Sequence, residues 1–165
     1  MEFIAIIAAR SGSKGIVNKN TTIINKKKLI EYTFQVAQKS KHIKKIFVTT
    51  NDKNVINVAK KYKYIKILLR KKKLSLSKSL ISEAIHDALK RSRTEFPNIS
   101  NFILLQPTSP QRTLIDIENA IKMFKKNNQN NLISISEPIN HPSEMISFTK
   151  NKYSFLIKRK KQMNR

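Results

Sequence analysis

A continuous apolar run passes directly into a short polar loop in the sequence Ile4-Ala5-Ile6-Ile7-Ala8-Ala9-Arg10-Ser11-Gly12-Ser13-Lys14-Gly15. The run has no alternating polar residues, which predicts a strand buried on both faces, as in a parallel sheet. The loop contains both glycines of the chain, and glycine lets a ligand approach the main chain closely. With the cations Arg10 and Lys14, this loop favours a phosphate site. Its spacing matches neither GxxxxGK[ST] nor GxGxxG, so an ordinary glycine-containing turn is the alternative.

Strand and helix patterns alternate along the rest of the chain. Apolar, β-branched runs predict strands, and apolar residues at helical spacing predict the helices between them. The further strands are predicted at 46–50, 65–69, 102–105 and 132–136, and the helices at 29–39, around Val55, Ala59 and Tyr62, at 79–91, and after a capping box of Thr113 and Asp116. This order predicts an α/β fold, in which helices cover both faces of a mostly parallel sheet.

Three polar segments directly follow predicted strands, namely 9–20, 70–79 and 106–112. Ligands of parallel sheets bind at the carboxyl ends of the strands, so we expect these three segments to converge on one ligand. Beyond Ser136 the alternation fades, and residues 137–165 predict an extended basic tail without a helix.

The chain has 165 residues, a formal charge of +24 and no cysteine. Without cysteine, disulfides and cysteine metal sites are excluded, and no apolar run reaches the roughly 18 residues of a membrane span. We therefore expect a cytoplasmic protein with no membrane partner. The lysine clusters are scattered and lack the interleaved aromatic residues that stack on bases, so a solvated surface is favoured over a nucleic-acid partner.

Two loop motifs, taken together, resemble a known enzyme family. They are Ala9–Gly15 with Lys19-Asn20, and Gln106–Arg112. In this order, and with the stretches 29–33, 48–52 and 58–62 between them, they resemble the N-acylneuraminate cytidylyltransferase (CMP-sialic acid synthetase) family. The resemblance implies a Rossmann-like three-layer nucleotidyltransferase fold. It also implies one domain overall, with a nucleotide-binding α/β core at 1–136 and the incomplete start of a sugar-pocket and dimer-arm region at 137–165.

The family reaction would transfer CMP from CTP to a nonulosonic acid, an acidic nine-carbon sugar. Its products would be pyrophosphate and the CMP-sugar for cell-surface glycan synthesis. Such transfer depends on positioning and charge neutralisation. The resemblance implies catalytic roles for Arg10 and Lys14, and sugar contacts for Gln106 and, on weaker grounds, His141. The implied nucleotide-binding residues are Arg10, Ser11, Gly12, Ser13, Lys14, Gly15, Asn20 and Arg70. Without the resemblance, Arg70 in its basic run would be interpreted as a solvated cation.

The sequence also departs from the family pattern. Val17 and Lys71 stand where prolines are usual, and Asn51 and Ser77 where acidic residues are usual. The family implies Mg²⁺, but its aspartate ligands are not in this chain, and we assign no metal ligand. We therefore expect a C-terminally truncated member, homodimeric if full length. The alternative is a catalytically impaired homologue that only binds a nucleotide or another polyanion, and the sugar could also be pseudaminic, legionaminic or a 3-deoxy-octulosonic acid.

Overall fold

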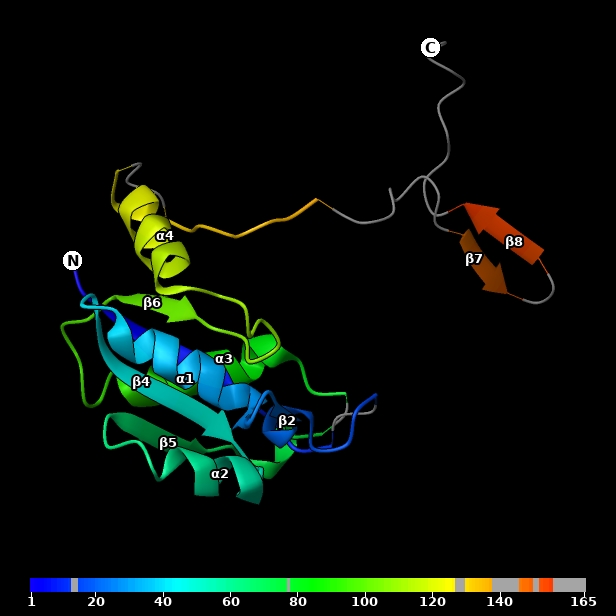
Figure 1. Ribbon diagram of the computed structural model, residues 1–165, viewed down its shortest axis with the longest axis horizontal. Helices are drawn as coiled ribbons and strands as arrows, with labels where there is room; N and C mark the ends of the chain where they lie inside the picture. The colour runs from blue at the N-terminus through cyan, green and yellow to red at the C-terminus, as the bar shows by residue number, and fades with distance from the viewer. Residues whose placement is uncertain (13–14, 77, 127–129, 138–145, 150–151, 156–165) are drawn as a thin grey trace, which may run out of the picture. The chain divides into compact units, whose positions relative to one another are not determined.

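The computed structural model describes residues 1–12, 15–76, 78–126, 130–137, 146–149 and 152–155. The chain divides into two compact units, 1–129 and 130–165 (Figure 1). The first unit contains the α/β sheet and the second an antiparallel hairpin. Among the helices of the described ranges, none has the length and apolarity that a bilayer crossing needs.

The first unit contains strands, α-helices and two short 3₁₀ turns. Its elements are β1 (Phe3–Ala8), η1 (Lys19–Thr21), β2 (Ile23–Ile24), β3 (Lys27–Lys28), α1 (Leu29–Lys39), β4 (Ile43–Thr50), α2 (Lys53–Ala59), β5 (Ile65–Leu69), η2 (Lys72–Leu74), α3 (Ile81–Ser92), β6 (Asn101–Leu104) and α4 (Leu114–Lys126). The hairpin of the second unit pairs β7 (Ile146–Thr149) with β8 (Lys152–Phe155).

The main sheet of the first unit has four parallel strands in the order β5-β4-β1-β6. The opening apolar run forms β1, which lies between β4 and β6, and this position explains why it has no polar face. Ile6 pairs with Phe47 of β4 on one side and with Leu104 of β6 on the other. The predicted α/β fold with a mostly parallel sheet is confirmed.

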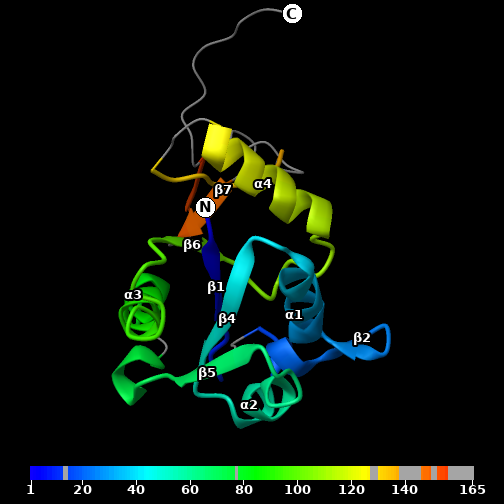
Figure 2. The same cartoon turned by 90° about the vertical axis from the view of Figure 1, so that its left-hand side faces the viewer.

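Helices pack on both faces of this sheet, because successive side chains of a strand point to opposite faces. Phe3, Ala5 and Ile7 of β1 belong to a buried cluster with apolar residues of α1, α2 and α4. Ile4 and Ile6 belong to a second cluster, with residues of β4, β5 and α3. Figure 2 shows α3 on one side of the sheet and α1 and α2 on the other.

Side chains at the helix starts fix where the helices begin. Asp52, rather than its neighbour Asn51, caps α2 and accepts hydrogen bonds from the N–H groups of Asn54 (2.9 Å) and Val55 (3.4 Å). Before α4, the Asp116 carboxylate accepts from the Thr113 N–H at 2.7 Å, and the Thr113 hydroxyl accepts from the Asp116 N–H at 3.2 Å. The predicted capping box is therefore present.

Some predicted elements are wrong. Residues 132–136 form no strand, and Ile133 and Ile135 are exposed. Strand preference is expressed only where a neighbouring strand completes the ladder, and none of the described strands pairs with this segment. The predicted extended tail contains the β7–β8 hairpin instead. The strand predicted at 102–105 lies at the sheet edge as β6, which leaves Phe102 44% exposed.

Candidate functional site

A cleft of about 440 Å³ lies at the carboxyl ends of the parallel strands. Its walls come from the three polar segments that follow β1, β5 and β6, so their predicted convergence is confirmed. The described lining residues are Ala8, Arg10, Gly15, Ile16, Lys19, Asn20, Arg70, Ser79, Leu80, Ile81, Gln106, Pro107 and Thr108.

The loop after β1 is fastened to the end of β4. The Ser11 N–H donates to Asn51 Oδ1 at 2.9 Å, and Asn51 Nδ2 donates to Ser11 Oγ at 2.7 Å. Gly12 follows with a φ of 72°, a left-handed conformation that glycine adopts without steric cost. The paired amide and serine therefore set the direction in which the loop leaves the sheet. Ser13 and Lys14 lie outside the described residues.

Asn20 closes the same loop from η1. Its side chain is buried, and Nδ2 donates to the backbone oxygen of Arg10 at 3.3 Å. The amide therefore joins the two ends of the segment 10–20 while it also lines the cleft. Asn18, two residues earlier, takes a left-handed conformation with a φ of 52°, which asparagine tolerates better than most residues.

Arg70 continues the line of β5 into the cleft. Its backbone N–H donates to Thr50 O at 2.8 Å, and its Nη2 donates to Thr49 O at 3.0 Å. The residue is only 8% exposed, so the solvated cation that its basic run alone predicts is wrong. Burial, and then the charge of Arg10, lower the pKa of Arg70 below its usual value.

Arg70 forms no ion pair with any carboxylate in the described part of the chain. Arg10, which also lines the cleft, donates from Nη1 to Leu76 O at 3.4 Å and likewise has no carboxylate partner there. A buried guanidinium beside a second cation is unfavourable unless an anion binds. The cleft therefore offers a positively charged site with the geometry of an anion receptor.

Gln106, two residues after the end of β6, also lines the cleft. Its side chain is exposed, and its backbone oxygen accepts from Arg112 Nη2 at 3.2 Å. Burial lowers the pKa of the Arg112 guanidinium, and the negative charge of Asp116 partly offsets this lowering. Gln106 is thus free to contact a second ligand, while Arg112 holds its loop.

Three apolar residues of the cleft were missed by the sequence analysis as site residues. They are Ile16, Leu80 and Ile81, and each is more than half exposed. Helical spacing assigns Ile81 to the buried stripe of α3, but it is 51% exposed at the first position of that helix. Ile81 is the first residue of α3 and has no apolar residue one turn before it. That position could have identified Ile81 as exposed.

The two histidines in the described ranges, His42 and His86, are not among the lining residues of the cleft. His42 immediately precedes β4, and its Nε2 lies 3.4 Å from Oε2 of Glu118 on α4. His86 is exposed on α3. His141, the second residue implied for the sugar, lies outside the described residues.

The cleft does not fit the magnesium ion that the resemblance implies. In the ranges that the structure describes, no group of three or more His, Asp or Glu side chains could hold a metal ion. The described lining residues include no carboxylate, which is the ligand that Mg²⁺ prefers.

A family model described as cytidylyltransferase matches residues 4–163. N-acylneuraminate cytidylyltransferase of Escherichia coli O18:K1:H7 is 35% identical over 145 residues, which are 88% of this chain and 33% of that protein. CMP-N,N'-diacetyllegionaminic acid synthase of Legionella pneumophila is 33% identical over 125 residues, 76% of this chain and 54% of that protein. The chain thus spans about a third to a half of the length of these relatives.

The fold is also similar to solved structures. A CMP:2-keto-3-deoxy-manno-octonic acid synthetase complexed with CTP superimposes with a TM-score of 0.59 at 18% identity, and the match covers 78% of this chain and 49% of that one. At this identity the likeness concerns the fold alone.

Proposed function

The chain belongs to the cytidylyltransferase family, and we propose that it takes part in the transfer of CMP from CTP to a sialic-type nonulosonic acid. The observation that carries the proposal is the cleft, whose lining combines the cations Arg10 and Arg70 with Gln106. Two arginines without a carboxylate partner among the described residues suit a triphosphate. Because CTP is a cytoplasmic nucleotide, we propose a cytoplasmic location.

In the proposed reaction, the anomeric hydroxyl oxygen of the sugar attacks the α-phosphorus of CTP. The new O–P bond replaces the bond to the β-phosphate, pyrophosphate leaves with the electron pair, and the hydroxyl proton is lost to solvent. Arg10 and Arg70 neutralise charge that moves onto the leaving group, as fixed donors do in a preorganised site. The backbone of the loop 11–15 and Lys14 are proposed to share this work.

The remaining site residues divide between the two substrates. Asn20 is proposed to contact the nucleotide, because an amide can donate and accept at a pyrimidine edge. Gln106 is proposed to contact the acyl sugar, together with His141. The apolar side chains of Leu80 and Ile81 lie in the same cleft and provide a surface for the uncharged face of a sugar or base.

The test is a pyrophosphate-release assay with CTP and a panel of acceptors, combined with detection of the CMP-sugar. The panel contains N-acetylneuraminic, legionaminic, pseudaminic and 3-deoxy-octulosonic acids, because relatives at similar identity are named for sialic and legionaminic acids. Formation of a CMP-sugar with one acid supports the proposal and names the substrate. No product with any of them, together with no measurable CTP binding, would overturn it.

A second candidate is nucleotide or polyanion binding without transfer. The specific observation in its favour is the charge of +24 together with a cleft whose described lining contains cations and no carboxylate. CTP binding without turnover would indicate the nucleotide form of this candidate. Salt-sensitive binding of RNA that is tighter than CTP binding would indicate the polyanion form.

A further inference from the structure

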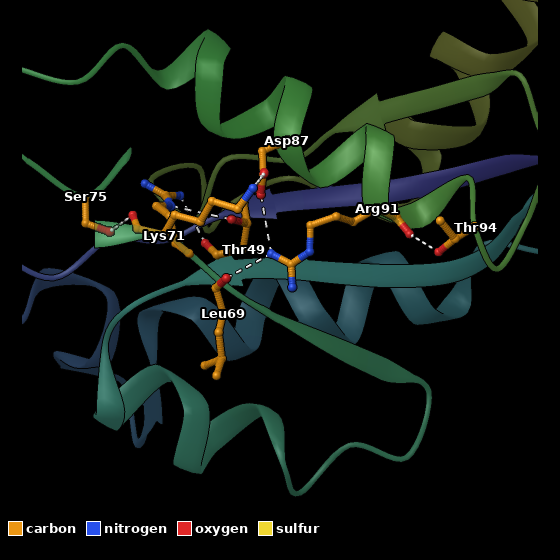
Figure 3. A network of polar contacts seen from close by, with 8 residues as sticks. Thr49, Leu69, Lys71, Ser75, Asp87, Arg91 and Thr94 are labelled. Carbon is orange, nitrogen blue, oxygen red and sulfur yellow. Dashed lines mark hydrogen bonds and ion pairs between the residues drawn. The ribbon is translucent and has the colours of Figure 1, made fainter. Parts of the chain in front are cut away.

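Arg70 lies between two residues that are both fastened to α3. On one side, the backbone oxygen of Leu69 accepts a hydrogen bond from Arg91 Nη1 at 2.8 Å. On the other side, Lys71 Nζ lies 3.1 Å from Asp87 Oδ1. Asp87 Oδ2 in turn lies 3.3 Å from Arg91 Nη1, one helical turn further along α3. Figure 3 shows Lys71 and Arg91 converging on the single carboxylate.

We propose that Asp87 is a positioning residue for the Arg70 guanidinium, because its carboxylate organises the contacts that hold both chain neighbours of Arg70 against α3. The inference deepens the proposed function and rests on it, since Arg70 is there assigned to the triphosphate. Asp87 itself does not line the cleft.

The burial of Asp87 distinguishes this network from an ordinary surface ion pair. Its side chain is 14% exposed, although those of Lys71 and Arg91 are 61% and 36% exposed. Burial alone would raise the pKa of the carboxyl, but hydrogen bonds and charges from Lys71 and Arg91 lower it overall. Asp87 therefore stays ionised at neutral pH and keeps both contacts. Because the carboxylate is largely buried, its contacts with Lys71 and Arg91 fix the local geometry at the end of β5.

The distribution of charge around Arg70 also supports a positioning role for Asp87. The two cations on α3 and beside it, Arg91 and Lys71, share a carboxylate, whereas Arg10 and Arg70 share none with the described part of the chain. Lys71 is directed to α3 and is not among the cleft residues. Asp87 thus removes a neighbouring ammonium from competition for the anion while it leaves the guanidinium free.

The backbone of Lys71 provides an independent test of positioning. Its φ of −60° and ψ of 144° are values that proline adopts without strain. No hydrogen bond among the described residues uses the Lys71 N–H, and Arg70 before it continues the β5 ladder, as suits a residue before proline. Lys71→Pro should therefore restrain the same turn covalently, without the ion pair.

The experiment compares Asp87→Asn with wild type and with a matched control, Glu95→Gln. Glu95 pairs with Lys66 outside the cleft, so its replacement removes the same charge from a different ion pair. Hydrogen exchange of the backbone amides at 69–75 is measured without ligand, and CTP affinity by calorimetry. We expect faster exchange at 69–75 and about tenfold weaker CTP binding in Asp87→Asn only, the size of one weakened charged hydrogen bond.

Rescue then separates positioning from general stability. The double variant Asp87→Asn with Lys71→Pro should regain slow exchange at 69–75 and most of the CTP affinity. If Asp87→Asn fails to fold, Lys71→Gln removes one of the two contacts of the carboxylate, from its exposed side, and should show losses in the same direction. Failure of wild type to bind CTP would overturn the proposed function, and the exchange result would still decide whether Asp87 holds the backbone at 69–75. Exchange at 69–75 equal to that of Glu95→Gln, or CTP affinity unchanged beside faster exchange, would overturn the positioning role.

Discussion

Replacement of Arg70 by methionine should separate binding from stability, because the two effects have opposite signs. Arg70 is a buried cation without a carboxylate partner in the described ranges, and burial lowers its pKa. The Arg70 guanidinium donates two hydrogen bonds to Thr49, at 3.0 Å and 3.4 Å. Such charged hydrogen bonds are worth roughly 1.5–3 kcal/mol each, and the cost of an uncompensated buried charge, several kcal/mol even after relaxation, offsets or exceeds them.

The expected result in the absence of ligand is a free energy of unfolding that is unchanged or raised by about 1 kcal/mol. Without the Arg70 guanidinium, the cleft should bind CTP about a hundredfold more weakly, since a charged hydrogen bond with a phosphate contributes roughly 1.5–3 kcal/mol. Urea denaturation and calorimetric titration with CTP measure the two quantities.

The matched control is Arg93→Met, which removes the same charge from an exposed position at the end of α3. It should leave both unfolding and CTP affinity within about 0.5 kcal/mol of wild type. A loss of more than about 2 kcal/mol of stability in Arg70→Met, with CTP affinity at the level of the control, would show that Arg70 has a structural role and would refute the reasoning.

Three further outcomes follow from the same contacts. Asn51→Ala removes both hydrogen bonds with Ser11. It should weaken CTP binding about tenfold, measured by titration, and lower the free energy of unfolding by about 1 kcal/mol, measured by denaturation. An unchanged CTP affinity would contradict the anchoring of the loop. Gln106→Ala should leave stability and CTP affinity unchanged, because the side chain is exposed. It should raise only the KM for the acceptor acid. A change in CTP affinity alone would contradict the assignment of Gln106 to the sugar. Because the folded-state pKa of Asp87 is lowered, its stabilising contribution is present above the unfolded-state pKa of about 3.9 and is lost as pH falls through the folded-state value. Stability of wild type should therefore decline more steeply below about pH 4 than that of Asp87→Asn, and parallel declines would contradict this.

The parts of the fold that local patterns determine were predictable from the sequence. Helix α1 occupies the predicted residues 29–39, because its apolar stripe, including Ile30 and Phe34, is spaced for one buried face. Strand β5 also matches its predicted range. The segment 132–136 was not predictable in this way, since its apolar residues favour a strand only when another strand lies beside it.

The candidate site was predictable as a set of loops but not as a set of contacts. Topology alone brings the segments after β1, β5 and β6 to one end of a parallel sheet. The bonds that shape the site join residues far apart in sequence, such as Ser11 with Asn51 and Arg70 with Thr49. The basic run that begins at Arg70 does not indicate that Arg70 is buried, nor that Lys71 pairs with a carboxylate of α3.

The contrast between neighbouring cations shows where the large positive charge is relevant to function. Lys71 and Arg91 are compensated by one shared carboxylate, whereas Arg70, which precedes Lys71 in the chain, is buried without such compensation in the described residues. If the charge only reflected composition, the most buried guanidinium would be expected to have the best carboxylate partner, because burial makes an unpaired charge costly. Here the carboxylate serves the more exposed cations, and the buried one faces the cleft. An anionic substrate is therefore indicated by the uncompensated Arg70 guanidinium, which an external anion would stabilise, and not by the net charge.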